Sequence, residues 1–411
     1  MTRRIVVTGL GAVTPLGENF PVSWNALIAG RDAQAPLDLF DTTGCRCHHA
    51  AAATLPPLPY LPAKTTRRLP RASRLAIPAA REALASAGLL DAESRSVLRE
   101  LPFSVSTTAG GMAFGEDFLR RVLAGNRSKS RSHLFSQVSR YLPQQQVLDV
   151  QQALGFAGHS VIIANACASG ANAIGHAADL ISAGAADCVL TGGFEALTEL
   201  VFVGFDCLQA TSTDRCRPFD LNRSGLLLGE AAAFLVLESA GHAQRRGASP
   251  ICELTGYGHT TDFFHLTQPQ PDGAALVGVM RAAAAQARIA PAQIGYLNAH
   301  GTATLVNDGV EARAYTTLLG EDLESVRISS TKAAIGHTLG AAGAVESLFA
   351  IEALRTGHLP PQLNLQTPIP EIAPALVGAK ESSSNLHHVM SVNLGFGGSN
   401  AALIFSRNPS P

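Results

Sequence analysis

The chain has little charge and few aromatic residues for its length. Of its 411 residues, 15% are charged and 6% are aromatic, whereas 46% are hydrophobic. This composition excludes a disordered chain and predicts a well-buried globular protein. The formal net charge of −1 provides no overall field that would attract nucleic acid or an anionic membrane, so neither is expected as a partner. An anionic partner would have to meet a local basic patch.

Long apolar runs and paired cysteines are also missing. No uninterrupted run reaches the ~18 apolar residues that a membrane span needs. The run at Ile5-Val6-Val7 is too short for a signal peptide and predicts a buried strand. The seven cysteines are scattered and odd in number, which favours free thiols in a reducing cytoplasm.

One cluster, Cys45-Arg46-Cys47-His48-His49, contains several residue types that bind metals. Its spacing is tighter than the thiol pairs of structural zinc sites, and no second cluster lies nearby. We therefore expect a surface loop here and no bound metal.

The pattern of apolar residues and glycines predicts strands alternating with helices, hence an α/β protein. Predicted strands cover 4–9, 103–108, 160–165, 187–191, 231–238, 251–258, 294–298, 326–330, 388–393 and 401–406, with glycines ending the first and fourth. Predicted helices cover 20–29, 76–87, 168–182, 273–287, 310–318 and 341–354, with 115–150 mostly helical and 31–75 a surface excursion. A strand followed by a helix of small residues occurs at both 160–182 and 326–354. This indicates an internal duplication, with halves at 1–250 and 251–411.

Cys167 lies where a buried, β-branched strand meets a helix of small residues. Backbone N–H groups and the helix dipole at such a turn favour a thiolate. A thiolate is a strong nucleophile toward thioesters. The alternative is a small buried core cysteine, the commoner fate of a free cysteine.

Two histidines and a lysine sit in glycine-bearing loops of the second half. His300 follows a predicted strand and precedes Gly301, while His337 follows Gly336, with Lys332 five positions upstream. Judged singly, each histidine is more often a solvated or locally bonded residue, and the lysine an exposed one.

The segment 393–400 is a glycine-rich turn between two predicted strands. A phosphate-binding loop would be followed by a helix, so a nucleotide site is not expected. Phe396 stands among three glycines as a bulky side chain on a hinge. A backbone N–H beside it is suited to stabilise an oxyanion.

Taken together, these motifs resemble the β-ketoacyl-acyl carrier protein synthases, nearest the type II elongating enzymes of the thiolase superfamily. The resemblance runs nearly end to end, through Val6-Val7-Thr8-Gly9-Leu10-Gly11, Thr14-Pro15-Leu16-Gly17, Ala166-Cys167-Ala168-Ser169-Gly170, Arg217-Pro218-Phe219-Asp220, Leu228-Gly229-Glu230, Asn298-Ala299-His300-Gly301-Thr302, Ser330-Thr331-Lys332, Gly336-His337, Gly340-Ala341-Ala342-Gly343-Ala344-Val345-Glu346 and Gly395-Phe396-Gly397-Gly398-Ser399-Asn400. It implies the thiolase fold, in which two related αβαβα halves form five layers.

The resemblance also implies an acyltransferase that performs a decarboxylative Claisen condensation. Cys167 would carry the acyl chain as a thioester, and His300 and His337 would bind the malonyl thioester carbonyl. Lys332 would support the histidines, and Phe396 would supply an oxyanion N–H and gate the site. Its other assignments are Thr302, Thr304, Ala109 and Phe205 for substrate binding, with Glu346 and Asp308 behind the catalytic residues.

The partner implied by the resemblance is an acyl carrier protein, whose phosphopantetheine arm brings the substrates; no cofactor bound to the chain itself is implied. Lys64, Arg67 and Arg68 match the family's basic patch beside the tunnel mouth, and Arg127, Lys129 and Arg131 would extend it, unless they are a solvated charge run. A homodimer is expected, and a heterodimer with a chain-length-factor-like subunit is an alternative. Ala109 replaces a larger aliphatic residue common in the family, which suggests a specialised polyketide, polyene or unusual fatty acid pathway.

Three rival functions are weighed against the elongating enzyme. A starter enzyme using acyl-coenzyme A would carry asparagine in place of His337. A thiolase would carry a second cysteine near the C-terminus, but none follows Cys252. A non-catalytic partner subunit would have lost Cys167.

Overall fold

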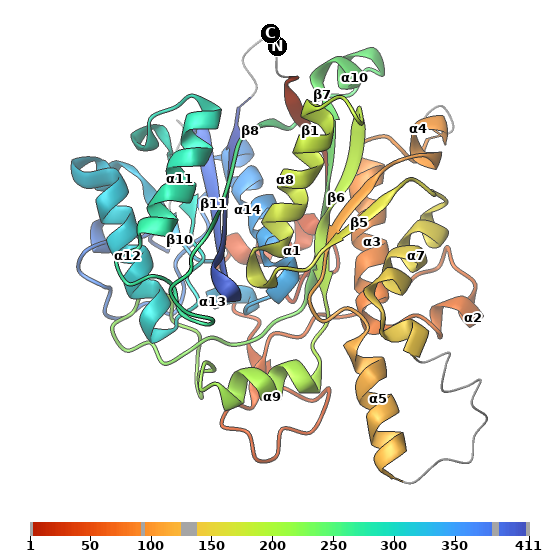
Figure 1. The fold of residues 1–411 in the computed structure, drawn as a ribbon, viewed down its shortest axis with the longest axis horizontal. Coiled ribbons are helices and arrows are strands. Elements are labelled where there is room, and N and C mark those ends of the chain that lie inside the picture. The colour runs from red at the N-terminus through yellow and green to blue at the C-terminus, as the bar shows by residue number, and fades with distance from the viewer. Residues whose placement is uncertain (1–2, 92–94, 125–137, 380–385, 408–411) are drawn as a thin grey trace.

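The computed structural model describes residues 3–91, 95–124, 138–379 and 386–407 (Figure 1). The strands of the main sheet are β1 (Ile5–Val13), β4 (Phe103–Ser106), β5 (Ser160–Ile163), β6 (Cys188–Glu195), β7 (Ala231–Ser239), β8 (Cys252–Thr261), β9 (Tyr296–Asn298), β10 (Arg327–Ser329), β11 (His388–Gly395) and β12 (Ser399–Ser406). The helices are α1 (Phe20–Ile28), α2 (Ala63–Thr66), α3 (Arg71–Ser86), α4 (Arg95–Arg99), α5 (Met112–Leu123), α7 (Pro143–Leu154), α8 (Ser169–Ser182), α9 (Glu199–Cys207), α10 (Ala240–Arg245), α11 (Ala274–Ala287), α12 (Leu305–Leu319), α13 (Lys332–Ile335) and α14 (Ala342–Thr356). A small hairpin, β2 (Ala35–Pro36) with β3 (His49–Ala50), stands apart.

The main sheet consists of two halves with the same strand topology. Its order is β10-β9-β11-β12-β8-β1-β7-β6-β4-β5, so each half has five strands. In the first half β4 pairs parallel with β5 and β6, and β7 pairs antiparallel with β6 and β1. In the second half β9, β10, β11, β12 and β8 repeat that pattern strand for strand. The halves join where Val6 and Val7 of β1 pair with Glu253 and Cys252 of β8.

Helices cover the two halves of the sheet in layers (Figure 1). The helices α8 and α14 pack against each other and fill the middle of the molecule. The outer face of the first half carries α3 and α7, and the outer face of the second carries α11 and α12. The predicted five-layer α/β architecture is therefore confirmed, while the domain boundary at 250 stays a prediction. No helix among the described residues is long and apolar enough to cross a membrane.

The glycines expected to end two strands instead lie inside them. β1 continues through Gly9 and Gly11, and β6 continues through Gly192 and Gly193. A Cβ on Gly11 would lie 2.2 Å from the carbonyl oxygen of Ala79, so glycine here lets the backbone of α3 approach the strand. The prediction failed because glycine serves two purposes. It permits a chain reversal at the end of a strand, and it also permits a helix to pack closely against the middle of one.

We expect Gly11→Ala to destabilise the fold, because its new methyl group meets the backbone of α3, which cannot move aside. The free energy of unfolding, measured by urea titration, should fall by about 1–3 kcal/mol. The matched control is Gly278→Ala on α11, where a Cβ meets nothing within 4 Å. That variant should be as stable as the native protein or more stable by up to about 1 kcal/mol. Equal stabilities for the two variants would contradict this account.

The segment 31–75 is only partly the surface excursion expected. Cys47 and Ala51 have no exposed surface, and the Ala51 N–H donates to the carbonyl of Leu228 at 2.8 Å. The N–H groups of Arg46 and Cys47 donate to the carboxylate of Asp206 on α9. The loop holding the Cys/His cluster therefore lies at the surface, with Arg46 and His48 exposed, but it is anchored to α9 and buries Cys47.

Parallel pairing decides where the loops with the signature residues meet. The loops after β5, β9, β10 and β11 all leave from carboxyl ends of parallel strands. Within each half such ends lie at one edge of the sheet, where ligand sites of α/β proteins form, and the turn after β5 contacts the end of β11, so both halves bring their loops to the same edge of the molecule. This edge lies at the end of the molecule opposite the two termini, near α9 and α13 (Figure 1).

Candidate active site

Cys167 occupies a tight turn between β5 and α8. A single 3₁₀ turn, Ala166–Ala168, leads directly into the helix, and Ala166 takes a φ of +57°, unusual for a residue other than glycine. The Ser169 hydroxyl braces the turn by accepting from the N–H of Asn165 at 2.8 Å and donating to the Ala166 carbonyl at 2.5 Å. Cys167 is 5% exposed and lines a pocket of about 280 Å³. The predicted position at a helix N-terminus is confirmed.

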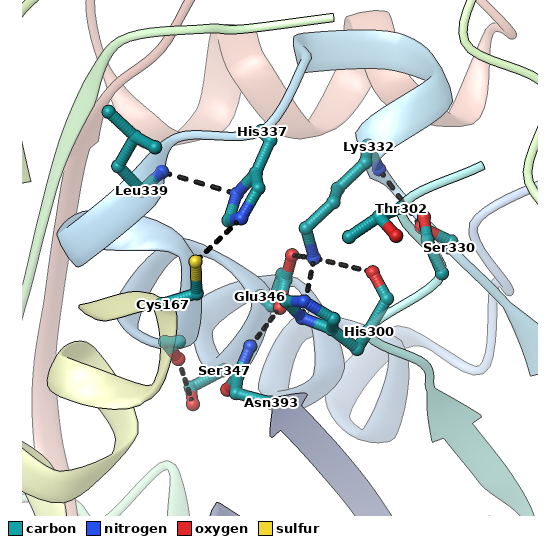
Figure 2. A network of polar contacts seen from close by, with 12 residues as sticks. Cys167, His300, Thr302, Ser330, Lys332, His337, Leu339, Glu346, Ser347 and Asn393 are labelled. Atoms are coloured by element: carbon teal, nitrogen blue, oxygen red, sulfur yellow. Dashed lines mark hydrogen bonds and ion pairs between the residues drawn. The ribbon is translucent and has the colours of Figure 1, made fainter. Parts of the chain in front are cut away.

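His337 faces the sulfur of Cys167 (Figure 2). Its Nε2 lies 3.0 Å from Sγ, and its Nδ1 accepts from the N–H of Leu339 at 3.2 Å. Because Nδ1 is an acceptor, the ring proton of the neutral imidazole sits on Nε2. His337 therefore donates toward the sulfur and the pocket and is not placed to take a proton from Cys167.

Lys332 orients the second histidine. Its ammonium lies 3.3 Å from His300 Nδ1, donates to the His300 carbonyl at 2.6 Å and forms a buried ion pair with Glu346 (Figure 2). An ammonium only donates, so His300 Nδ1 accepts and its Nε2 carries the proton. Asn393 donates to the other oxygen of Glu346 at 2.6 Å. The His300 and His337 rings lie edge to face with centroids 5.4 Å apart, so two N–H donors converge beside Cys167.

The electrostatics keep both imidazoles neutral. Burial, and then the charge of Lys332, lower the pKa of His300 and of His337 well below their usual value. Burial raises the pKa of Cys167 to about 12, although the Lys332 charge and the N–H of Phe396 act in the opposite direction. The resting nucleophile is therefore a thiol, which corrects the expectation that the helix terminus alone favours a thiolate.

Neutral, buried histidines should make stability fall in mildly acidic solution. An unfolded histidine takes up a proton near pH 6.5, whereas folded His337 does so only at much lower pH. Below pH 6.5 the unfolded state thus binds more protons, and the free energy of unfolding falls as pH falls. His337→Gln removes one such site, so between pH 6.5 and 5.5 the wild-type protein should lose about 1 kcal/mol more than the variant. Parallel curves in urea titrations would mean that folded His337 titrates normally.

Two carboxylates on α12 hold the backbone of the His300 loop. Glu311 accepts from the N–H groups of His300 at 2.9 Å and Gly301 at 2.6 Å, and Asp308 accepts from the N–H of Ala303 at 3.0 Å. Burial and nearby Asp308 raise the pKa of Glu311 to about 7. Asp308 is among the residues predicted from the sequence, whereas Glu311 is not. The signal was its spacing, three residues further along the same helix and therefore on the same face.

Phe396 closes the pocket over Cys167. It lies on Gly395–Gly398, which runs from the last residue of β11 to the start of β12 and which we call the gate loop. Its ring stacks on Phe205 of α9 with centroids 5.6 Å apart, and its N–H donates to the sulfur of Cys167. Both rings line the pocket, as do Thr302 and Thr304, whose hydroxyls are 3.0 Å apart.

Other predicted residues do not meet at this pocket. Ala109 is buried, but it does not line the pocket, and its N–H donates to Glu195 at 2.8 Å. Lys64 lies in α2, Arg67 and Arg68 directly follow it, and none of the three lines the pocket. Arg127, Lys129 and Arg131 lie outside the described residues.

Among the described residues, the one group with metal-ligand geometry is Cys188, Glu238 and His242. It lies away from the pocket, in a different place from the cysteine–histidine cluster at 45–49. Arg246 and His242 already donate to Glu238, so its carboxylate is neutralised without a metal.

Comparison with known proteins gives a consistent picture across the chain. The family descriptions "Beta-ketoacyl synthase, N-terminal domain" and "Beta-ketoacyl synthase, C-terminal domain" match residues 2–243 and 251–366. The chain is 34% identical over 412 residues to "3-oxoacyl-[acyl-carrier-protein] synthase 2" of Staphylococcus aureus (strain COL), covering 98% of each chain.

Two solved structures show the same similarity in three dimensions. The ishigamide ketosynthase/chain length factor superposes with a TM-score of 0.90 at 28% identity, covering 100% of both chains. A type II polyketide ketosynthase in complex with its acyl carrier protein, bound to the hexaketide, superposes with a TM-score of 0.88 at 28% identity, covering 99% of this chain and 100% of that one.

Proposed function

Because the chain belongs to the β-ketoacyl synthase family, we propose that it condenses an acyl thioester with malonyl-acyl carrier protein to give 3-oxoacyl-acyl carrier protein. The observation that carries this proposal is the convergence of two neutral imidazole N–H donors beside a buried thiol. The thiolase fold, known here from the solved ketosynthases, provides the frame.

In the first half-reaction Cys167 takes the acyl group from its carrier. The sulfur attacks the thioester carbonyl, the bond to the pantetheine sulfur breaks, and the thiol proton leaves with that sulfur. The Cys167 thiol becomes a thioester while the pantetheine thioester becomes a thiol. No net proton acceptor is therefore needed, even though the pKa of Cys167 is raised to about 12. We assign the N–H of Phe396, which hydrogen-bonds the Cys167 sulfur, to stabilising the oxyanion that develops on the thioester carbonyl.

In the second half-reaction the malonyl thioester loses carbon dioxide. The electrons of the broken C–C bond move onto the thioester oxygen, where the Nε2–H groups of His300 and His337 stabilise them. The resulting enolate attacks the acyl-cysteine, which forms the new C–C bond and breaks the bond to sulfur. Cys167 leaves as a thiolate and takes a proton from water to return to the resting thiol. Neutral donors suit this task because they stabilise the oxygen without first giving up a proton.

The partners follow from the same membership. We propose an acyl carrier protein as the donor of both substrates, with its phosphopantetheine arm entering past Thr302 and Thr304, and no cofactor bound to the chain.

The second partner is another ketosynthase-like chain. Strand β5 ends the sheet, and the nearby surface exposes several large apolar residues, Leu119, Leu123, Val138, Tyr141, Leu142 and Leu148. A homodimer is the simplest assembly, and the chain length factor of one similar structure makes a heterodimer the alternative. We propose that the protein works in the reducing cytoplasm, where the nucleophilic thiol of Cys167 would stay free.

The substrate range is proposed to be specialised. Small Ala109, in place of a larger aliphatic residue, would alter the acyl pocket, although it does not line the pocket that the structure describes. Activity confined to ordinary saturated chains across an acyl panel would refute this part of the proposal.

The test is intact-protein mass spectrometry with a panel of saturated and polyunsaturated acyl-carrier proteins, followed by malonyl-carrier protein. We expect an acyl adduct on Cys167 that malonyl-carrier protein discharges, with a product two carbons longer. No adduct from any donor would refute independent catalysis and indicate a chain that works only beside a partner subunit.

A further inference from the structure

The gate loop is tied to the nucleophile turn by a side-chain contact to which no role has been assigned. The Nδ2 of Asn165, two residues before Cys167, donates to the hydroxyl of Ser399 at 2.9 Å. Ser399 is the first residue of β12, directly after the gate loop. The bond therefore connects the segment that carries the thiol with the segment that covers it, 234 residues apart in the sequence.

The backbone of Ser399 is paired with Gly395 and Thr261, and the bond to Asn165 adds a side-chain restraint where the gate loop enters β12. Asn172 of α8 donates to the same hydroxyl at a longer 3.4 Å, and Tyr257 holds Asn172 in place at 2.9 Å. Elsewhere the loop is bonded to the segment after β8: the Gly397 N–H donates to the carbonyl of Leu266 at 2.7 Å, and the Gly398 carbonyl accepts from the N–H of Asp262 at 2.8 Å. The residues that follow Phe396 are thus anchored at two places, the segment after β8 and the nucleophile turn.

Only one of the two polar atoms of the Asn165 side chain has a hydrogen-bond partner among the described residues. Its Oδ1 is buried and has no hydrogen-bond partner among the described residues, while its Nδ2 is used on Ser399. A buried acceptor without a partner is costly and needs an explanation. The turn around it is strained too, since Ala166 has a positive φ. A side chain kept in such a place is consistent with a role in positioning the site.

We propose that Asn165 and Ser399 form a latch that holds the gate loop closed over Cys167, so that the Phe396 N–H stays aimed at the sulfur. Both are positioning residues, since neither lines the pocket. The latch deepens the proposed function, on which its consequence for catalysis rests. With the loop closed, acylation precedes malonyl binding. With the latch broken, malonyl-carrier protein enters before Cys167 is acylated, loses carbon dioxide, takes a proton from water at the enolate carbon and leaves as acetyl-carrier protein.

The variants are Asn165→Ala, Ser399→Ala and the double variant, with Ser399→Thr to restore the hydroxyl. Ser406→Ala is the matched control, because it removes a bonded hydroxyl from the far end of the same strand. The first readout is the ratio of acetyl-carrier protein to 3-oxoacyl product. The second is the rate of Cys167 alkylation by iodoacetamide, mapped by peptide mass spectrometry, which needs no catalysis.

Losing one such hydrogen bond changes an equilibrium by about three- to tenfold. Asn165→Ala and Ser399→Ala should each raise both readouts by about that factor. The double variant should give the same increase as either single variant, because the same hydrogen bond is lost in all three. Ser399→Thr and Ser406→Ala should match the native protein. Unchanged alkylation in the single variants, or additive effects in the double variant, would overturn the latch. A native protein that yields no 3-oxoacyl product, while the variants still alkylate faster, would overturn the proposed function and leave the latch standing.

Discussion

Replacing Cys167 with alanine is expected to abolish acyl-enzyme formation and to reduce condensation to less than about one-thousandth of the native rate. The thiol contacts His337, and within the part of the chain that the structure describes no other cysteine lines the pocket. Decarboxylation of malonyl-carrier protein should continue, because His300 and His337 keep their N–H donors. The measurement is intact-protein mass together with separate assays of carbon dioxide and 3-oxoacyl product.

The control for this experiment is Cys252→Ala. Cys252 is also buried but lies at the start of β8, away from the pocket. The Cys252→Ala variant should form the acyl-enzyme and condense at the same rates as the native protein. Condensation by Cys167→Ala at a native rate would refute the assignment of the nucleophile.

Replacing Lys332 with methionine is expected to damage both stability and catalysis. Lys332 is 1% exposed and forms an ion pair with Glu346, so its removal leaves a buried carboxylate without its counter-charge. Breaking such a pair costs about 3–5 kcal/mol of unfolding free energy. The Nδ1 of His300 also loses its donor, so the proton is no longer confined to Nε2, and malonyl decarboxylation should fall by about 10²–10³-fold. Acylation of Cys167 should be affected far less.

The double variant Lys332→Met/Glu346→Gln separates the two effects. A neutral amide can still accept from Asn393, so most of the lost stability should return. The rate of decarboxylation should stay low, because His300 still lacks its donor. Recovery of the rate together with the stability would show that Lys332 acts only through folding.

The architecture was largely predictable from the sequence because strands and helices are encoded by local patterns. The run at 160–165 and the small residues after it predicted β5 and α8, and the glycine-bearing loops located His300 and His337. The failures have one cause. Gly11 is inside a strand because of α3, and Cys47 is buried because of α9; each depends on a distant segment.

The sequence by itself determined the repeating α/β order and the identity of the thiol, the two imidazoles and the ammonium, because these are properties of single residues and short periods. Only the tertiary structure decided the protonation states of the thiol and the two imidazoles. Backbone N–H and ammonium donors from other loops select the tautomers of His337 and His300, and burial keeps the thiol of Cys167 protonated. The contact between Asn165 and Ser399 likewise exists only after the two halves have packed. Proton positions and loop anchors depend on distances of about 3 Å between groups far apart in the chain, and only packing sets such distances.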